Sequence, residues 1–182
     1  MTRSPLRLLV LLAAAFTAIA LAIPAQAAAP YCGITWGSLP KQAGNSDPSL
    51  QGSELTAVRA GQHTCYDRLV LDVTGSTRVA SYRVAYVPAV RSDGSGAVVP
   101  LKGGAFLQIS LGVNNATAPP ASTGDVANVS GFRTFREVAA AGGFEGYTGE
   151  GLGVRARLPF RVFTISGPGS TARVVIDVAH AW

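Results

Sequence analysis

The sequence has few of the residues on which enzyme chemistry usually depends. Its 182 residues include two histidines and two cysteines, and only 14% are charged. It has no Gly-x-Ser-x-Gly segment of the kind that presents a nucleophilic serine. The ten acidic residues stand isolated along the chain, so no pair is marked as the acid and base of a glycosidase. The sequence therefore gives no positive indication of an enzyme, and we expect no catalytic residues and no cofactor.

Basic residues do not form a run along the sequence. The formal net charge is +5, and it falls to +3 if Arg3 and Arg7 are removed with a leader. The remaining lysines and arginines are scattered and are not interleaved with aromatic residues, as a nucleic-acid surface would require. His63 and Cys65 are two residues apart, but no further histidine or cysteine lies near enough in sequence to complete a zinc site. We therefore expect neither a nucleic-acid partner nor a metal.

What the sequence does have at its start is an export signal. Two arginines precede the apolar run 8–23, Pro24 ends it, and the small-x-small string Ala25-Gln-Ala27 follows. The run is shorter than the roughly 20 residues that a membrane span needs, although a retained anchor is the alternative. We predict that 1–27 is a signal peptide cleaved between Ala27 and Ala28. The product would be a secreted or extracytoplasmic protein, associated with the cell envelope and without stable membrane insertion.

Two cysteines in an exported chain predict a disulfide. A Cys32–Cys65 bond would close a loop of about 34 residues and stabilise the fold by about 3–4 kcal/mol in the chain-entropy model. It would tie an N-terminal segment, 28–52, to the first core strand. Within that segment Trp36 is either a packed lid or a platform for stacking a ligand. The polar stretch 42–52 predicts a loop.

One six-residue pattern occurs twice. The string Arg-Leu-Val-Leu-Asp-Val that starts at Arg68 returns as Arg-Val-Val-Ile-Asp-Val starting at Arg173. Successive side chains of an extended strand point to opposite faces, so each copy would have one aliphatic face. The other face would carry Arg68 and Asp72 in the first copy, and Arg173 and Asp177 in the second. We predict that both copies are central strands of one core.

These four charged residues have two interpretations. They could form cross-strand ion pairs, each contributing roughly 0–1 kcal/mol. Alternatively, the two copies lie side by side and present a polar strip. The guanidinium groups would then bind carboxylates of a wall polymer or of its peptide stems. Tyr82 and Tyr86, on one face of the alternating segment 81–87, likewise either join the core or stack on sugar rings.

The rest of the chain is typical of short strands joined by turns. We predict a first strand at 54–59 and a hairpin turn at 93–96. The segment 133–139 fits either a helical face or a strand, and its flanking glycines and β-branched neighbours favour a strand. The glycines of 144–157 indicate bulges or tight corners. Together these patterns predict one all-β domain over 53–182. We expect an antiparallel β-sandwich of about 8–10 short strands with little helix.

Six segments in order resemble the AMIN-like domain of secreted actinobacterial proteins. They are Gly-Gln-His-Thr-Cys-Tyr-Asp-Arg-Leu-Val-Leu-Asp at 61–72, Tyr-x-Val-x-Tyr at 82–86, Pro-Leu-Lys-Gly-Gly-Ala-Phe-Leu at 100–107, Phe-Glu-Gly at 144–146, Pro-Phe-Arg-Val-Phe-Thr at 159–164, and Arg-Val-Val-Ile-Asp-Val at 173–178. The opening Cys-Gly-Ile-Thr-Trp-Gly-Ser at 32–38 resembles that of mycobacterial-type members. The resemblance implies a β-sandwich related to AMIN domains. Those domains are non-catalytic targeting modules associated with binding peptidoglycan or other envelope components.

Three functions follow as hypotheses. The first is an envelope module that binds peptidoglycan, another envelope glycan or an envelope protein, with binding residues among Arg68, Asp72, Arg173, Asp177, Tyr82 and Tyr86. The second is a carrier of a lipid or other small apolar ligand, because 48% of the residues are hydrophobic. The third is a hydrolase whose triad forms only in space, with His63 or His180 as its base. The sequence makes no prediction of oligomeric state.

Overall fold

Short strands account for almost all of the regular structure. A computed structural model describes residues 30–44, 53–76, 79, 81–113 and 126–182. The predicted signal peptide and its cleavage site between Ala27 and Ala28 lie outside the described residues. Among the described residues there is one 3₁₀ turn and no α-helix. The elements are η1 (Tyr31–Gly33), β1 (Lys41–Gly44), β2 (Glu54–Gln62), β3 (Tyr66–Thr74), β4 (Ser81–Val87), β5 (Val90–Arg91), β6 (Val98–Val99), β7 (Ala105–Leu111), β8 (Phe135–Phe144), β9 (Tyr147–Val154), β10 (Phe160–Ser166) and β11 (Thr171–Ala179).

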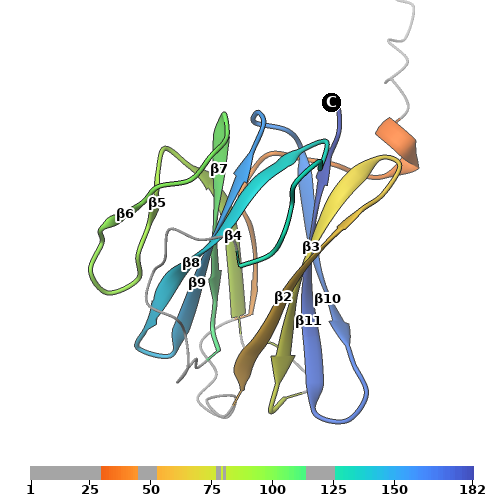
Figure 1. Ribbon diagram of the computed structural model, residues 1–182. Coiled ribbons are helices and arrows are strands. Elements are labelled where there is room, and N and C mark those ends of the chain that lie inside the picture. The colour runs from red at the N-terminus through yellow and green to blue at the C-terminus, as the bar shows by residue number, and fades with distance from the viewer. Residues whose placement is uncertain (1–29, 45–52, 77–78, 80, 114–125) are drawn as a thin grey trace, which may run out of the picture.

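The strands form two antiparallel sheets that pack face to face (Figure 1). One, here named the β3 sheet, has the order β10-β11-β3-β2. The other, named the β7 sheet, has the order β1-β4-β7-β9-β8. A separate hairpin of β5 and β6 lies outside them. The predicted all-β antiparallel sandwich is confirmed.

The two copies of the repeated pattern are neighbours in the β3 sheet, as strands β3 and β11. Burial alternates along β3: Leu69 and Leu71 are fully buried, whereas Val70 between them is half-buried. On β11, Val174 and Ile176 point into the same core. Both copies are therefore central strands that bury their aliphatic side in one shared interior, as the alternation predicts.

The main core fills the space between the two sheets. Phe135 and Phe160 are its largest fully buried side chains. The predicted strand at 133–139 is confirmed, because β8 begins at Phe135. A second, smaller cluster lies on the outer side of the β7 sheet. There Val90 and Val99 of the β5–β6 hairpin pack with small alanine side chains of β8.

The sheet surface under that hairpin is lined by glycine. In β9, Gly149, Gly151 and Gly153 alternate with residues that face the core, and β9 keeps an unbroken register with β7. A Cβ atom added to Gly151 would lie 2.7 Å from Leu101 Cδ1, and one added to Gly153 would lie 1.9 Å from the carbonyl oxygen of Lys102. The predicted bulges occur in the ladder with β8, whose register shifts opposite Gly153 and again opposite Gly149. The three glycines allow the loop that follows β6 to approach the strand closely.

The N-terminal segment 30–44, here named the strap, contacts both sheets and supplies the edge strand of one of them. β1 pairs antiparallel with β4 of the β7 sheet, and Gly37 forms a bridge with Phe160 of the β3 sheet. The predicted loop at 42–52 is therefore wrong for its first three residues. Three of the four residues of β1 are exposed, so its side chains show no alternation that would predict a strand.

A disulfide joins the strap to the β2–β3 hairpin. Cys32 in η1 is bonded to Cys65, which directly precedes β3, and their Cα atoms are 6.4 Å apart. The predicted Cys32–Cys65 bond is confirmed, and it ties the N-terminal segment to the first core strand. β2 continues past its predicted end at 59, because its ladder with β3 extends to the pair Gln62–Asp67.

Removing this disulfide should lower the free energy of unfolding by about 3–4 kcal/mol, since the bond restricts the unfolded chain. The test is guanidinium denaturation of a Cys32→Ala/Cys65→Ala variant beside the oxidised protein. The reduced wild-type protein serves as the control and should unfold at the midpoint of the variant. Equal midpoints for the variant and the oxidised protein would contradict the prediction.

Candidate functional site

The face of the β3 sheet that points away from the core carries four arginines and two aspartates from four strands. In the ladder between β3 and β11, Arg68 lies opposite Asp177, and Asp72 lies opposite Arg173. The charged residues predicted as one strip are therefore brought together. Arg161 of β10 and Arg59 of β2 complete two groups in which one carboxylate is shared by two guanidiniums.

The first of these, the Asp177 group, is built around a fully buried carboxylate. Arg68 donates from Nε to Oδ1 at 2.7 Å and from Nη2 to Oδ2 at 2.9 Å. Arg161 donates from Nε to Oδ2 at 2.8 Å. The hydrogen bond to Asp177 is the main reason why the pKa of the Arg68 guanidinium is raised. A carboxylate taken out of water in this way needs a cationic partner and hydrogen bonds, and Arg68 alone supplies one charge and two hydrogen bonds.

The second, the Asp72 group, is more open. Arg59 donates from Nε and Nη2 to the two carboxylate oxygens of Asp72, the Nη2–Oδ1 distance being 2.9 Å. Arg173 adds a hydrogen bond from Nε to Oδ1 at 3.1 Å. The hydrogen bond from Arg59 is the main cause that holds the pKa of Asp72 below its ordinary value, and burial partly opposes it.

Each group has more donors than its carboxylate can use. A guanidinium has five N–H donors, and a carboxylate has about four acceptor positions. Two guanidiniums around one carboxylate therefore keep several N–H groups for another ligand. Each group has two positive charges and one negative charge, so each carries a surplus charge of +1. Glu54 at the start of β2 is exposed on the same face, opposite Thr74 of β3. The cross-strand ion pairs expected from the sequence are present, and they use only part of the donors.

Aromatic rings surround the Asp177 group. The Arg161 guanidinium carbon lies 5.6 Å from the Trp36 ring centroid and 5.5 Å from that of Tyr66. The Arg68 guanidinium carbon lies 5.2 Å from the Tyr66 centroid. Phe163 contacts both cations, at 5.2 Å from Arg161 and 5.5 Å from Arg68. Trp36 thus packs as a lid at this cluster, and the rings hold both guanidiniums in place by cation–π contacts.

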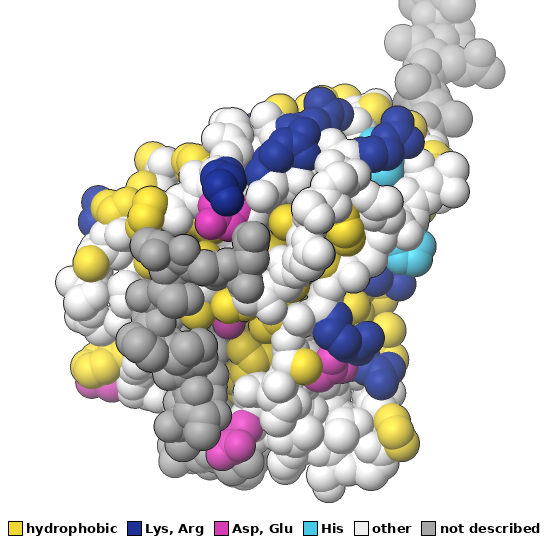
Figure 2. Space-filling view, viewed as in Figure 1, with side chains coloured by type: hydrophobic (Ala, Val, Ile, Leu, Met, Phe, Trp, Pro, Cys, Tyr) yellow, Lys and Arg dark blue, Asp and Glu magenta, His cyan; other side chains and the backbone are white. Residues whose placement is uncertain are grey.

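The arginines of both groups are open to solvent. Figure 2 shows Lys or Arg side chains beside Asp or Glu side chains over the β3 sheet, on the right of the view. The exposed fraction of the side chain is 25% for Arg68, 33% for Arg161, 40% for Arg173 and 56% for Arg59. A ligand can therefore reach all four guanidiniums without any rearrangement of the sheet.

Tyr82 and Tyr86 lie elsewhere. Both are on β4 of the β7 sheet and pack against the main core. The Tyr86 hydroxyl donates to the carbonyl oxygen of Leu158 at 2.7 Å and accepts from the N–H of Leu158 at 3.0 Å. Burial raises the pKa of Tyr82, and it raises that of Tyr86 to about 12. The six predicted binding residues therefore do not form one surface, and sugar stacking by the two tyrosines stays a prediction.

Arg59, Arg161, Tyr66 and Phe163 are not among the residues that the sequence singles out. Part of their signal is present, because Arg161 and Phe163 alternate with core-facing residues in a strand pattern. The pattern does not indicate which strands flank β3 and β11. Only the sheet order places the side chains of β2 and β10 beside the two aspartates.

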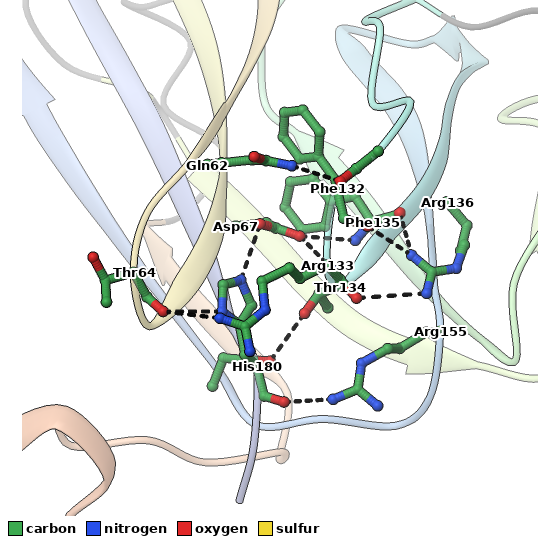
Figure 3. Close-up of polar contacts among 12 residues, drawn as sticks. Gln62, Thr64, Asp67, Phe132, Arg133, Thr134, Phe135, Arg136, Arg155 and His180 are labelled. Carbon is green, nitrogen blue, oxygen red and sulfur yellow. Dashed lines mark hydrogen bonds and ion pairs between the residues drawn. The ribbon is translucent and has the colours of Figure 1, made fainter.

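A second polar cluster is buried where the β2–β3 hairpin, the start of β8 and the C-terminal residues meet (Figure 3). Asp67 Oδ2 accepts hydrogen bonds from the backbone N–H groups of Thr134 at 2.6 Å and Phe135 at 3.1 Å. Its Oδ1 lies 3.0 Å from Nε2 of His180. His180 Nδ1 lies 3.2 Å from the carbonyl oxygen of Thr64. This cluster joins three segments of the chain to one another.

The arrangement does not favour His180 as a general base. A carboxylate and a backbone carbonyl both accept hydrogen bonds, and one of them faces each ring nitrogen. Neither nitrogen is therefore directed at a hydroxyl nucleophile, as a Ser–His–Asp triad requires. The other histidine, His63, stacks on the ring of Tyr66 with the centroids 4.6 Å apart.

One string, Ser38-Leu-Pro-Lys41, has the Ser-x-x-Lys spacing found in some acyl-transfer enzymes. Lys41 is the first residue of β1, and its ammonium group lies 5.4 Å from the centroid of the Phe160 ring. The lysine is thus packed against an aromatic side chain of the core. In the part of the chain that the structure describes, no three His, Cys, Asp or Glu residues are grouped so as to hold a metal ion.

One carboxyl group lies inside the apolar core. Glu150 of β9 is 4% exposed and points to the same side of the sheet as Leu152 and Val154. Ile109 and Ala140 lie opposite it in the neighbouring strands. Its Oε2 atom has no hydrogen-bond partner among the described residues. Burial raises the pKa of this carboxyl to about 8, so the group is mostly neutral at pH 7.

Apart from β1, the two sheets, including the paired Arg–Asp strands, lie in the part of the chain that matches a known family. The family model of the AMIN-like domain matches residues 53–180. The chain belongs to the AMIN-like domain family. No curated protein and no solved structure matches it. The AMIN-like match includes β2 to β11, whereas the strap and Trp36 precede it.

AMIN-like domains are generally non-catalytic binding modules, and membership indicates a module related to the cell envelope. The Cys32–Cys65 disulfide agrees with this, because such bonds persist in oxidising compartments outside the cytoplasm. Together the AMIN-like domain and the disulfide indicate an extracytoplasmic protein. Among the described residues there is no helix with the length and hydropathy needed to cross a bilayer.

Proposed function

We propose that this AMIN-like protein is exported and acts as a non-catalytic module of the actinobacterial cell envelope, where it binds peptidoglycan or another envelope glycan. The proposed organisation is a signal peptide at 1–27, a disulfide-tied segment at 28–52 and the AMIN-like domain at 53–182. Export is proposed from the arginine-led apolar run and its small-x-small cleavage string.

The observation that carries the proposal is the outer face of the β3 sheet. Its guanidinium groups retain N–H donors, and aromatic rings stand beside them. A glycan offers oxygen acceptors to such donors and apolar ring faces to such aromatics. The proposed absence of catalysis is supported by the two histidines, since His180 is bonded to Asp67 and Thr64 and His63 is stacked on Tyr66.

The experiment is co-sedimentation of the mature protein with isolated cell walls. Walls boiled in detergent and digested with protease are compared with untreated walls, and cellulose serves as a neutral insoluble glycan control. We expect saturable binding to both wall preparations, weakened by salt because exposed charges are screened. Protein that stays in the supernatant at every concentration contradicts the proposal. Binding to untreated walls alone would replace the glycan by an envelope protein as the partner.

A further inference from the structure

We propose that the outer face of the β3 sheet binds a polymer with repeated anionic groups, carboxylate or phosphate, through the Asp177 group and the Asp72 group as two cationic centres. The inference rests on the proposed function and adds to it the chemistry of the ligand. It starts from an imbalance: each centre holds two arginines around one aspartate and so keeps one positive charge.

Contacts within the Asp177 group use part of its donors. One edge of the Arg68 guanidinium is used by both oxygens of Asp177. The rings of Tyr66 and Phe163 contact this guanidinium and that of Arg161. Arg68 Nη2 also donates to the Tyr66 hydroxyl at 3.2 Å, and Arg161 Nη2 lies 2.7 Å from Asp177 Oδ2. The N–H groups that remain can form hydrogen bonds with carboxylate or phosphate oxygens.

Trp36 helps to prepare this centre for a ligand. Its indole Nε1 donates to the backbone oxygen of Tyr31 at 2.8 Å, and its ring lies against Arg161. A guanidinium that is already held loses less side-chain freedom when an anion binds. Because the strap that carries Trp36 precedes the AMIN-like match, this part of the centre comes from outside the matched domain.

The two centres lie on one line along the sheet. Arg68 and Asp72 are four residues apart on β3, which corresponds to about 13 Å of strand. A single small anion can occupy one centre only. A polymer with anionic groups along its length can occupy both, and the second contact then forms at a high effective concentration. The face therefore fits a polyanionic chain better than a free ion.

The test removes the surplus charge and keeps the aspartates paired. In Arg161→Gln/Arg173→Gln, Asp177 retains its two hydrogen bonds from Arg68, and Asp72 retains those from Arg59. The matched control, Arg83→Gln/Lys102→Gln, removes the same charge from exposed residues that lie outside the β3 sheet. Denaturation midpoints of both variants are measured first.

We expect the first variant to bind walls and soluble polyphosphate or polyglutamate at least about tenfold more weakly than wild type. The control variant should bind like wild type. Orthophosphate and acetate should bind far more weakly than the polymers. Equal loss in both variants, or no loss in either, overturns the inference. If the first variant folds poorly, the test is instead a titration of the wild-type protein with polyphosphate, followed by the arginine Nε–H chemical shifts. Polyphosphate must then perturb Arg161 and Arg173 and leave Arg83 unchanged.

Two treatments of the walls distinguish the source of the anion. Hydrofluoric acid removes phosphate-linked polymers, and carbodiimide amidation neutralises carboxylates. Loss of binding after either treatment supports the inference and names the group. Wild-type binding that survives both treatments overturns the anionic ligand but leaves the proposed glycan binding intact. Failure to bind any wall, with retained binding of soluble polyanions, overturns the proposed function and leaves the two cationic centres supported.

Discussion

Replacing Gly153 by alanine should lower the free energy of unfolding by more than about 4 kcal/mol. The added Cβ would lie 1.9 Å from the backbone oxygen of Lys102. No side-chain rotation can relieve this overlap, because the opposing atom belongs to the backbone. Gly153 is also paired with Phe106 in the unbroken ladder with β7, so the strand cannot shift without breaking ladder pairs.

The measurement is the denaturation midpoint and slope in guanidinium, compared with the wild-type protein. Gly61→Ala is the matched control: Gly61 also lies within a strand, and a Cβ added there meets nothing within 4 Å. We expect that control to unfold within about 0.5 kcal/mol of wild type. If Gly153→Ala is as stable as Gly61→Ala, the close packing of the loop after β6 on β9 is incorrect.

Stability should also fall as pH rises from about 4.5 to about 8, and Glu150 should account for on the order of 4–5 kcal/mol of the fall. The pKa of this carboxyl is about 8 in the folded protein, above its value in an unfolded chain. In that pH interval the folded state keeps a proton that the unfolded state has released. The stabilisation is therefore complete at low pH and is lost as pH approaches 8.

The test is the free energy of unfolding of wild type and Glu150→Gln at several pH values between 4 and 9. A neutral amide cannot titrate, so the difference between the two proteins isolates this one residue. Asp72 acts in the opposite sense at lower pH: its lowered pKa adds stability that is lost on acidification. Parallel pH curves for the two proteins would show that Glu150 is not protonated in the core.

The secondary structure could largely be predicted because it depends on local alternation. The copies that start at Arg68 and Arg173 each have an aliphatic face and a charged face. In both copies the aliphatic face is buried, as expected. What could not be predicted depends on contacts between segments that are far apart in the sequence. β1 forms its ladder with β4, which is distant in sequence, and three of its four residues are exposed. The need for glycine at Gly153 is set by the backbone oxygen of Lys102, which is distant in sequence.

The candidate site was only half predictable for the same reason. Arg68 and Asp177 could be identified from a repeat, since both lie within matching strings. Arg161 and Trp36 lie outside the repeat, and they reach the site through the position of β10 and through the strap. Glu150 was one of ten isolated acidic residues, and only its neighbours in the folded core distinguish it from the others.

By itself the sequence determined that this is a chain of short strands with one disulfide and two matching central strands. Those properties follow from residue alternation and cysteine content, which each segment carries on its own. Tertiary structure decided that Asp72 and Asp177 are each shared by two arginines, and that rings from the strap and β10 lie beside the Asp177 group. The charge balance and the hydrogen bonds of the site depend on which side chains are in contact. Strand order determines those contacts, and local sequence patterns do not encode strand order.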